Sequence, residues 1–320
     1  MPKRTVSFRV SCWLIAGVTV VGIATVALFG PPQELARERM VASTIPRKAA
    51  SVEELQNLDP KTEELLRIVT DKTEVLFSDC KGIVIEEIPG GGLSMVPAED
   101  AGTCRLAAVV PVAADGYFLT AAHALDGSSS QVVAILRDGE RMSAFVAPAR
   151  VVWIPSDWRV RPDLALLHAD VGSVEPFQVA ETPPSKEDTV VLTGSGGGHA
   201  TSVGRVLAVG PVIAGQRGSI YRLVRHNAPS MRGDSGGALA NLKGTLIGIG
   251  STIHPPDWLG WLPYIGSRIS NLMGGVGSYS QAVCPDPGWL DDLIAADRRR
   301  RMEDWLVEDH VDDGGTSRLP

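Results

Sequence analysis

Residues 232–239 read RGDSGGAL, and no other part of the chain restricts its structure as strongly. Ser235 stands among glycines, in a pattern that predicts a tight turn with an exposed serine hydroxyl. In such a turn the backbone around Gly233, Asp234 and Ser235 can direct N–H groups at a developing negative oxygen and so form an oxyanion hole. A G-x-S-x-G match is a weak signal in a chain with 34 glycines, so its meaning depends on partner residues elsewhere.

A candidate base lies upstream. Residues 115–125 read DGYFLTAAHAL, which predicts a turn, a strand and then His123 at the end of that strand. A serine nucleophile needs a base with a near-neutral pKa, and imidazole is the usual one. The other histidines stand in no comparable setting and are interpreted as structural or exposed: His168, His199, His226, His254 and His310.

Between the His123 and Ser235 segments, an acidic residue directly precedes an apolar stretch. Residues 161–167 read RPDLALL, so Asp163 lies at the edge of a strand predicted to be buried. A buried carboxylate is costly unless it accepts hydrogen bonds. The imidazole N–H of His123 would be such a donor, and the bond would fix the tautomer of the ring. The rival acids Asp138 and Asp157 lie in turn sequences and are more simply explained as solvated turn residues.

The wider pattern indicates an all-β domain. Hydrophobic residues make up 44% of the chain and charged residues 21%, as in soluble globular proteins. Between about residues 74 and 270, short apolar or alternating runs such as EVLF, RLAAVVPV, TVVLTG and GTLIGIG are separated by glycine and proline turns. Such spacing predicts about a dozen short strands in a barrel or sandwich.

Helical spacing occurs on both sides of this region. The first apolar series is Leu55, Leu58, Leu65, Leu66 and Val69. Pro60 should break or restart that helix. A second helix is predicted over 288–307, with Arg298 to Arg301 on a solvated face and disorder from about Glu308.

The N-terminus predicts membrane targeting. Residues 11–29 carry no charge, and Lys3, Arg4 and Arg9 precede them. This length suffices to span a bilayer, and the basic flank would stay in the cytoplasm while the rest crosses to the other side. The alternative is a cleaved signal peptide, since the small residues Thr25 and Ala27 could precede a cleavage site.

The order His, Asp, Ser with the motifs TAAH, DLALL and GDSGGAL resembles the trypsin and chymotrypsin family of serine peptidases, including its bacterial HtrA/Deg relatives. The likeness covers roughly residues 75–297, with 262–269 similar to the family's closing strand and 289–296 similar to its C-terminal helix. It implies two six-stranded antiparallel β-barrels and a serine endopeptidase whose triad is His123, Asp163 and Ser235. About 50 residues follow Ile269, too few for the PDZ domain of many HtrA relatives together with the final helix.

The chain departs from the family in its activation and specificity signals. It lacks the Ile-Val-Gly-Gly sequence that trypsin-like zymogens expose on cleavage. Family members that cut after Lys or Arg carry an acid where this chain has Pro229, so a preference for small or medium uncharged side chains is expected. The expected substrate-pocket residues are Pro229, Ser230, Gly250, Ser251 and Thr252. No cysteine flanks His123 or Ser235, but Cys80 and Cys104 could pair in an oxidising compartment, the alternative being isolated thiols.

The composition limits the classes of partner and ligand that the sequence predicts. The formal net charge of −7 argues against a general nucleic-acid binder, and the cysteine spacing predicts neither a zinc site nor any other metal site. No cofactor is expected; the expected partners are protein or peptide substrates and, through residues 11–29, a membrane. The predicted organisation is 1–30 membrane segment, 31–73 linker and short helix, 74–297 protease domain and 298–320 charged tail.

Two other functions remain open from the sequence. A G-x-S-x-G serine also occurs in α/β-hydrolase esterases, which need a helix directly after the serine. A protease fold can also serve as an inactive binding module, because a fold does not guarantee activity.

Overall fold

The computed structural model describes residues 60–87, 93–99, 102, 104–137, 143–157, 162–194, 200–230, 233–254 and 279–312. The predicted membrane segment 11–29 and the predicted closing strand 262–269 lie outside these ranges. None of the helices in the described ranges combines the length and the apolar character needed to cross a bilayer.

The first half of the domain is a closed barrel of six antiparallel strands, in the order β1-β4-β5-β8-β7-β6. Its strands are β1 (Glu74–Ser78), β4 (Arg105–Ala113), β5 (Tyr117–Thr120), β6 (Gln131–Arg137), β7 (Ser143–Trp153) and β8 (Ala165–Ala169). Inward-facing side chains such as Leu76, Phe118 and Leu167 fill the barrel and are fully buried. The apolar runs seen in the sequence therefore became strands because each could bury one face in this core.

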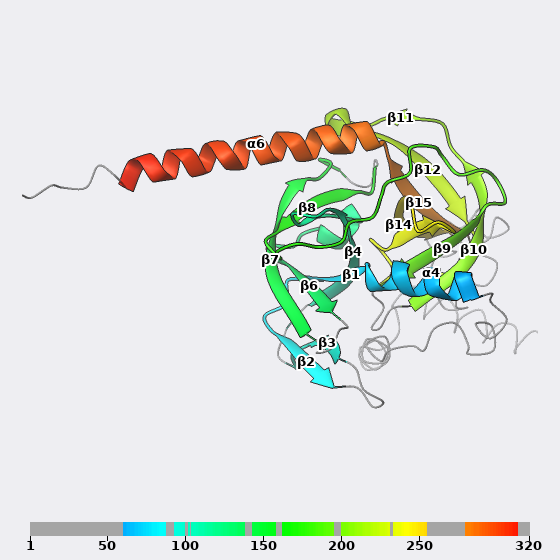
Figure 1. Ribbon diagram of the computed structural model, residues 1–320, viewed down its shortest axis with the longest axis horizontal. Helices are drawn as coiled ribbons and strands as arrows, with labels where there is room; N and C mark the ends of the chain where they lie inside the picture. Colours follow the sequence, from blue (N-terminus) through cyan, green and yellow to red (C-terminus); the bar gives the residue numbers. More distant parts are fainter. Residues whose placement is uncertain are drawn as a thin grey trace, which may run out of the picture.

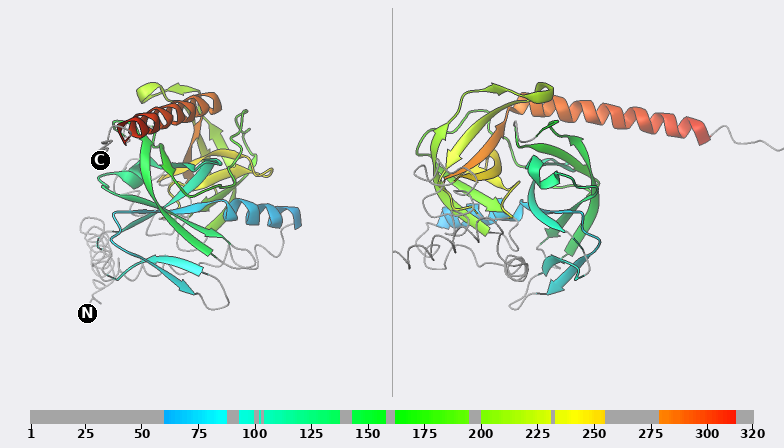
Figure 2. Two further views of the ribbon diagram at one scale, coloured as in Figure 1. Left: turned by 60° about the vertical axis from the view of Figure 1, so that its left-hand side comes forward. Right: turned by 180° about the vertical axis from the view of Figure 1, so that it is seen from behind.

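The second half is also an antiparallel barrel. Its ring runs β10-β9-β13-β14-β15-β12 and closes where β12 pairs with β10, and the two-residue strand β11 is added to β12. The strands are β9 (Thr189–Gly194), β10 (Ala200–Val209), β11 (Ile213–Ala214), β12 (Ile220–His226), β13 (Ala238–Asn241), β14 (Leu246–His254) and β15 (Tyr279–Pro285). The prediction of two six-stranded barrels is confirmed (Figures 1 and 2).

One strand of this ring was missed from the sequence. β15 lies between β14 and β12, the position expected for a closing strand, but it comes from 279–285. Its buried residues include Ser280 and Gln281, so the segment does not read as apolar.

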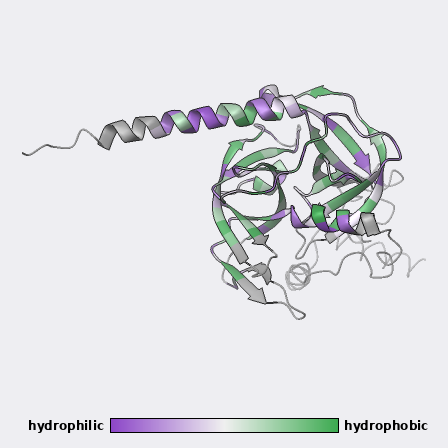
Figure 3. Cartoon of the chain, viewed as in Figure 1, coloured by the Kyte–Doolittle hydropathy of each residue, from purple (hydrophilic) through white to green (hydrophobic). Residues whose placement is uncertain are grey.

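A third core joins the two barrels. It combines Tyr117 and Leu166 of the first barrel with Val191 and Ile249 of the second. The strands of both barrels are largely apolar, as the green shading of Figure 3 shows. Burial of this shared core holds the two barrels together as one unit. The predicted site residues lie at the boundary between the barrels.

Helix α4 (Pro60–Asp71) begins at the proline predicted to restart it, a favoured first position because proline lacks the N–H that a helix start leaves unpaired. Val69 of α4 is fully buried in the shared core. The hydroxyls of Thr70 and Thr201 lie 2.5 Å apart, and those of Thr73 and Thr193 lie 2.6 Å apart. These contacts fix α4 against β9 and β10 of the second barrel. Strand β1, which follows α4 directly, belongs to the first barrel.

A hairpin extends from the first barrel. It consists of β2 (Ile83–Glu87) and β3 (Leu93–Pro97), and Cys80 and Cys104 form a disulfide across its base. The predicted pairing of these two cysteines is thus present in the structure. Cys284 is a buried free thiol whose pKa burial raises to about 11.

Helix α6 (Pro287–Asp312) follows β15 and crosses over the first barrel before leaving the body of the domain (Figures 1 and 2). Asp286 caps its start by accepting a hydrogen bond from the Trp289 amide at 3.0 Å. The expectation of disorder from Glu308 is wrong for 308–312, which are helical. The tail boundary predicted at 298 falls inside this helix. Arg298 to Arg301 are all exposed, in agreement with the predicted solvated face, and Arg298 and Arg301 also contact side chains of the first barrel.

The turn that carries Ser235 is wedged between the barrels. The Ala108 amide of β4 donates to the Ser235 carbonyl at 2.8 Å, and the Gly236 amide donates to the Gly250 carbonyl of β14 at 2.8 Å. Gly236 has φ +86°, and a Cβ added there would clash with the Ala108 carbonyl oxygen and with the Thr120 hydroxyl. Only glycine therefore fits at this point of contact.

We predict that Gly236→Ala destabilises the domain far more than Gly127→Ala. Gly127 also has a positive φ of +70°, but open space surrounds the position of its missing Cβ. The left-handed conformation alone should cost about 1 kcal/mol, whereas the added clash at Gly236 should raise the loss above about 3 kcal/mol. Urea unfolding of the two variants measures the difference. Equal unfolding midpoints would show that the turn is not tightly enclosed.

Candidate active site

The strand register brings His123 and Asp163 together. β5 pairs with β8 so that Thr120 lies opposite Ala165. His123 follows β5 in the short 3-10 helix η1 (Ala122–Leu125), and Asp163 directly precedes β8. Two residues that lie 40 positions apart in the chain therefore meet at one edge of the first barrel.

A continuous chain of hydrogen bonds runs from Asp163 through His123 to Ser235. His123 Nδ1 lies 2.7 Å from Asp163 Oδ2, and His123 Nε2 lies 2.8 Å from Ser235 Oγ. An ionised carboxylate can only accept, so Nδ1 carries the proton and Nε2 accepts from the serine hydroxyl. The structure therefore brings together the three residues that the sequence singled out as nucleophile, base and acid.

The Asp163 carboxylate is held from three directions. Oδ1 accepts the backbone N–H of His123 at 2.8 Å, and Oδ2 accepts the Ser251 hydroxyl at 2.5 Å in addition to the imidazole. Burial by itself would raise the pKa of Asp163, but the hydrogen bonds from His123 and Ser251 outweigh it and lower that pKa. The acid therefore stays ionised although only 7% of its side chain is exposed.

Ser251 is a site residue whose role the sequence did not reveal. It was expected in the substrate pocket, whereas its hydroxyl donates to the carboxylate of Asp163, the predicted acid. Ser251 lies on β14 in the second barrel, so this bond crosses from one barrel to the other. A serine in the strand GIGST carries no local signal for such a contact, because the contact depends on how the barrels pack.

The predicted oxyanion-hole residues form a single turn before β13. Gly233 has φ +99°, a conformation that favours glycine. Asp234 is 5% exposed and its carboxylate packs against Gly194, where any side chain would collide with it. The Ser235 amide N–H has no acceptor among the described residues, while the Gly237 amide donates to the Asp234 carbonyl at 3.0 Å. The turn thus has the tight geometry that the glycines predicted.

Of the residues expected in the substrate pocket, Gly250 contacts this turn directly. Gly250 exchanges backbone hydrogen bonds with Gly236 and Gly237. Ser230 Oγ accepts the Ser280 hydroxyl at 2.7 Å, and the Pro229 carbonyl accepts the Ser202 hydroxyl at 2.7 Å. Thr252 lies opposite Gln281 in the register of β14 and β15. Ser280 could not be singled out from the sequence because its strand was not predicted.

His168 and His226 lie apart from this hydrogen-bond chain. His226 is fully buried in β12, and burial lowers its pKa to about 4. His168 is buried on β8 against the ring of Tyr117, and burial lowers its pKa as well. Both therefore stay uncharged near neutral pH, in agreement with the structural interpretation. His199 lies outside the described residues.

Comparison with known proteins agrees with the fold. A family model for the trypsin-like peptidase domain matches residues 102–249, a segment that includes His123, Asp163 and Ser235. A Haemophilus influenzae protein described as "Probable periplasmic serine protease do/HhoA-like" is 30% identical over 153 residues. That alignment covers 47% of this chain and 31% of the relative, so the chain spans about a third of the length of the protein it matches.

Solved structures of HtrA-type proteases are similar at lower identity. The protease AlgW with a decapeptide has 20% identity and a TM-score of 0.48, with 73% of this chain and 66% of that chain covered. AlgW with a tripeptide has 23% identity and a TM-score of 0.43, with coverages of 60% and 54%. Over residues 102–249 this chain is therefore similar to the trypsin-like peptidase domain, and its paired barrels and the order of His123, Asp163 and Ser235 agree with that likeness.

Proposed function

We propose that this protein is a serine endopeptidase with His123, Asp163 and Ser235 as its catalytic triad. The observation that carries the proposal is the unbroken hydrogen-bond chain, with 2.7 Å between Asp163 and His123 and 2.8 Å between His123 and Ser235. The nucleophile is within reach of its base, and the base is oriented by a third group, which is the arrangement that nucleophilic catalysis by serine requires.

The first chemical step would form an acyl-enzyme. Ser235 Oγ attacks the carbonyl carbon of the scissile peptide bond while His123 Nε2 takes the hydroxyl proton. The Asp163 carboxylate stabilises the imidazolium that results. The carbonyl oxygen becomes negative and accepts hydrogen bonds from backbone amides of the turn at Gly233, Asp234 and Ser235, and each such donor contributes roughly 3–4 kcal/mol of transition-state stabilisation.

The remaining steps return the enzyme to its starting state. The C–N bond breaks as His123 gives its proton to the leaving amine, and the acyl group stays on Ser235. Water then attacks the ester carbonyl, with His123 removing a proton from that water and returning it to Ser235 Oγ. The products are a carboxylic acid and an amine, and no cofactor is needed to balance the reaction.

The alternative functions receive less support. An α/β-hydrolase esterase would carry a helix directly after the serine, whereas strand β13 begins at Ala238. An inactive binding module would have no need to hold a buried, ionised Asp163 by hydrogen bonds from His123 and Ser251. Proteolysis therefore accounts for more of the site.

Specificity for small or medium uncharged side chains is part of the proposal. Pro229 stands where relatives that cut after Lys or Arg carry an acid, and the neighbouring Ser230 and Ser280 present a pair of neutral hydroxyls. A buried cation without a compensating charge is strongly unfavourable. A pocket at Pro229, Ser230, Gly250 and Thr252 would therefore disfavour basic substrates.

We further propose that the enzyme acts on protein or peptide substrates outside the cytoplasm. The apolar segment 11–29 with its basic flank favours export with a retained anchor, and the similar H. influenzae protein is described as periplasmic. Carbonate extraction of expressing cells tests the anchor, since a wholly soluble protein would exclude it.

We predict that Ser235→Ala lowers the rate of cleavage of an unfolded protein such as casein by on the order of 10⁴-fold or more. The variant loses the nucleophile but keeps the fold. Ser185→Ala removes the hydroxyl of a serine that takes no part in the Asp163–His123–Ser235 hydrogen-bond chain, and this variant should cleave at the wild-type rate. Undiminished cleavage by Ser235→Ala would exclude this serine as the nucleophile.

We predict that peptide libraries show no enrichment of Lys or Arg directly before the cleaved bond. Small and medium uncharged residues should be enriched there instead, because the hydroxyl pair at Ser230 offers hydrogen bonds without charge. Mass spectrometry of the cleaved library reads the preference. Clear enrichment of basic residues would contradict the proposed specificity while leaving the triad unaffected.

A further inference from the structure

The outer half of α6 is a helical arm that the domain does not need for its own core. The first turns of the helix bury Leu290 and Ile294 in the core shared by the barrels. Further along, Met302 is 67% exposed and Trp305 is 62% exposed. Figures 1 and 2 show the helix leaving the first barrel and continuing into solvent. With 26 residues the helix is about 39 Å long, so the arm extends well beyond its anchor.

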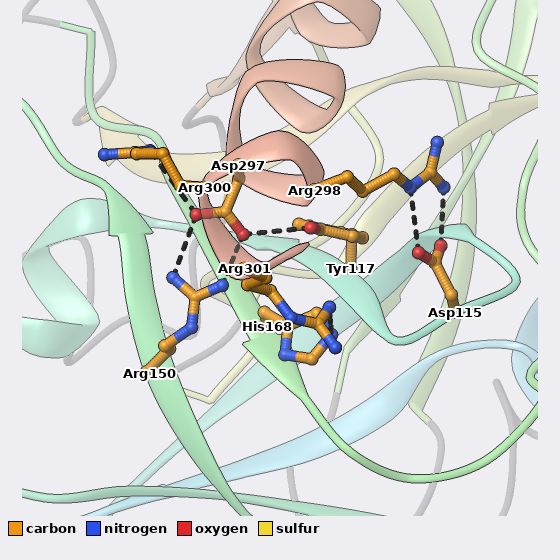
Figure 4. A network of polar contacts seen from close by, with 8 residues as sticks. All are labelled: Asp115, Tyr117, Arg150, His168, Asp297, Arg298, Arg300 and Arg301. Carbon is orange, nitrogen blue, oxygen red and sulfur yellow. Dashed lines mark hydrogen bonds and ion pairs between the residues drawn. The ribbon is translucent and has the colours of Figure 1, made fainter. Parts of the chain in front are cut away.

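A buried acid fixes the direction of this arm. Asp297 is 2% exposed and accepts the Tyr117 hydroxyl of β5 at 2.9 Å (Figure 4). Both of its carboxylate oxygens also accept the guanidinium of Arg150 on β7. Burial by itself would raise the pKa of Asp297, but Arg150 and Tyr117 outweigh it and lower that pKa, so the acid is ionised. A charge held from two strands leaves the helix little freedom to pivot.

Two further contacts hold the next turn of the helix. Arg298 donates to both carboxylate oxygens of Asp115, at 2.8 and 2.6 Å, and Arg301 contacts the His168 ring (Figure 4). The Asp115 turn precedes β5 and His168 belongs to β8. The arm beyond these contacts is therefore presented in a fixed orientation by rigid strands.

The arm borders a groove with a mixed apolar and charged lining. The groove is lined by Asp115, Arg298, Arg301, Met302, Asp304 and Trp305. A single exposed apolar residue needs no explanation, but an exposed Trp and Met one turn apart on a helix held rigidly in solvent form a typical binding surface.

Charge is segregated along the arm. Residues 298–301 are all arginine, and acids follow at 303, 304, 308, 309, 312 and 313. Within the part of the chain that the structure describes, Arg299 and Glu303 form no ion pair. Acids near the C-terminal end of a helix are unfavourable because the helix dipole is negative there. A second arm in the opposite direction would place arginines beside these acids, whereas a parallel arm would place like charges together.

We propose that the arm, residues 298–312, binds a second copy of this chain as an antiparallel helix pair with two-fold symmetry. Met302 of each copy packs against Trp305 of the other, which sets residue 299 of one helix opposite residue 308 of its neighbour. A two-fold interface needs a surface complementary to itself, and a helix with a basic half followed by an acidic half has that property in the antiparallel orientation. The contact of a few helical turns is small, so the dimer is weak and salt-sensitive.

Sedimentation of the full chain in mild detergent, over roughly 1–200 μM and at low and high salt, tests this proposal. The wild type should show a monomer–dimer equilibrium that weakens with salt. Trp305→Glu should weaken association by about tenfold or more. Arg299→Glu and Glu308→Arg should each weaken it several-fold, and the double variant should return to about the wild-type constant.

The control is Leu242→Glu, which places the same charge at another exposed apolar residue, 48% exposed and on the turn after β13. It should leave the equilibrium unchanged. An unchanged melting temperature shows that each variant is folded. A chain that stays monomeric throughout this range would overturn the proposal and leave the arm to a different partner. Stronger association in Arg299→Glu would also overturn it, because in the antiparallel pair the new glutamate would face Glu308 and be repelled.

Discussion

The hydrogen bond from the Ala108 amide to the Ser235 carbonyl links the serine turn of the second barrel to a strand of the first. The candidate site depends on this contact, because Ser235 comes from one barrel while His123 and Asp163 come from the other. Gly236 makes the close approach possible, and the bond from Ser251 to Asp163 repeats the link on the other side of the site. A shift of one barrel against the other by an ångström would lengthen the 2.8 Å contact between His123 and Ser235 and weaken catalysis.

Helix α6 also connects the two barrels. It continues from β15, which pairs with the strand that carries Ser251, and it is held to the first barrel through Asp297 and Tyr117. β5 bears Tyr117 at one end and leads into His123 at the other. The helix therefore braces the two barrels against each other, and its outer arm can carry a partner without entering the site.

The sequence predicted which residues meet at the candidate site better than it predicted the packing around them. His123, Asp163 and Ser235 could be found because each lies in a motif beside a strong strand pattern, and most strands could be found because they are apolar. β15 could not, since Ser280 and Gln281 are polar residues that become buried only between two other strands. Ser251 was assigned to the substrate pocket, and the contact of the exposed Arg298 was not predicted, because their partners, Asp163 and Asp115, are distant in the chain. Long-range pairing of this kind leaves no periodic trace in the sequence.

The central claim is that Ser235 is made nucleophilic by His123. Labelling of the full chain with a fluorophosphonate, followed by mass spectrometry of its peptides, tests this claim most directly because the reagent reacts with activated serines. The account predicts a single adduct on the peptide that contains Ser235, and no adduct in a folded His123→Ala variant. An adduct on another serine, or equal labelling of Ser235 without the histidine, would contradict it.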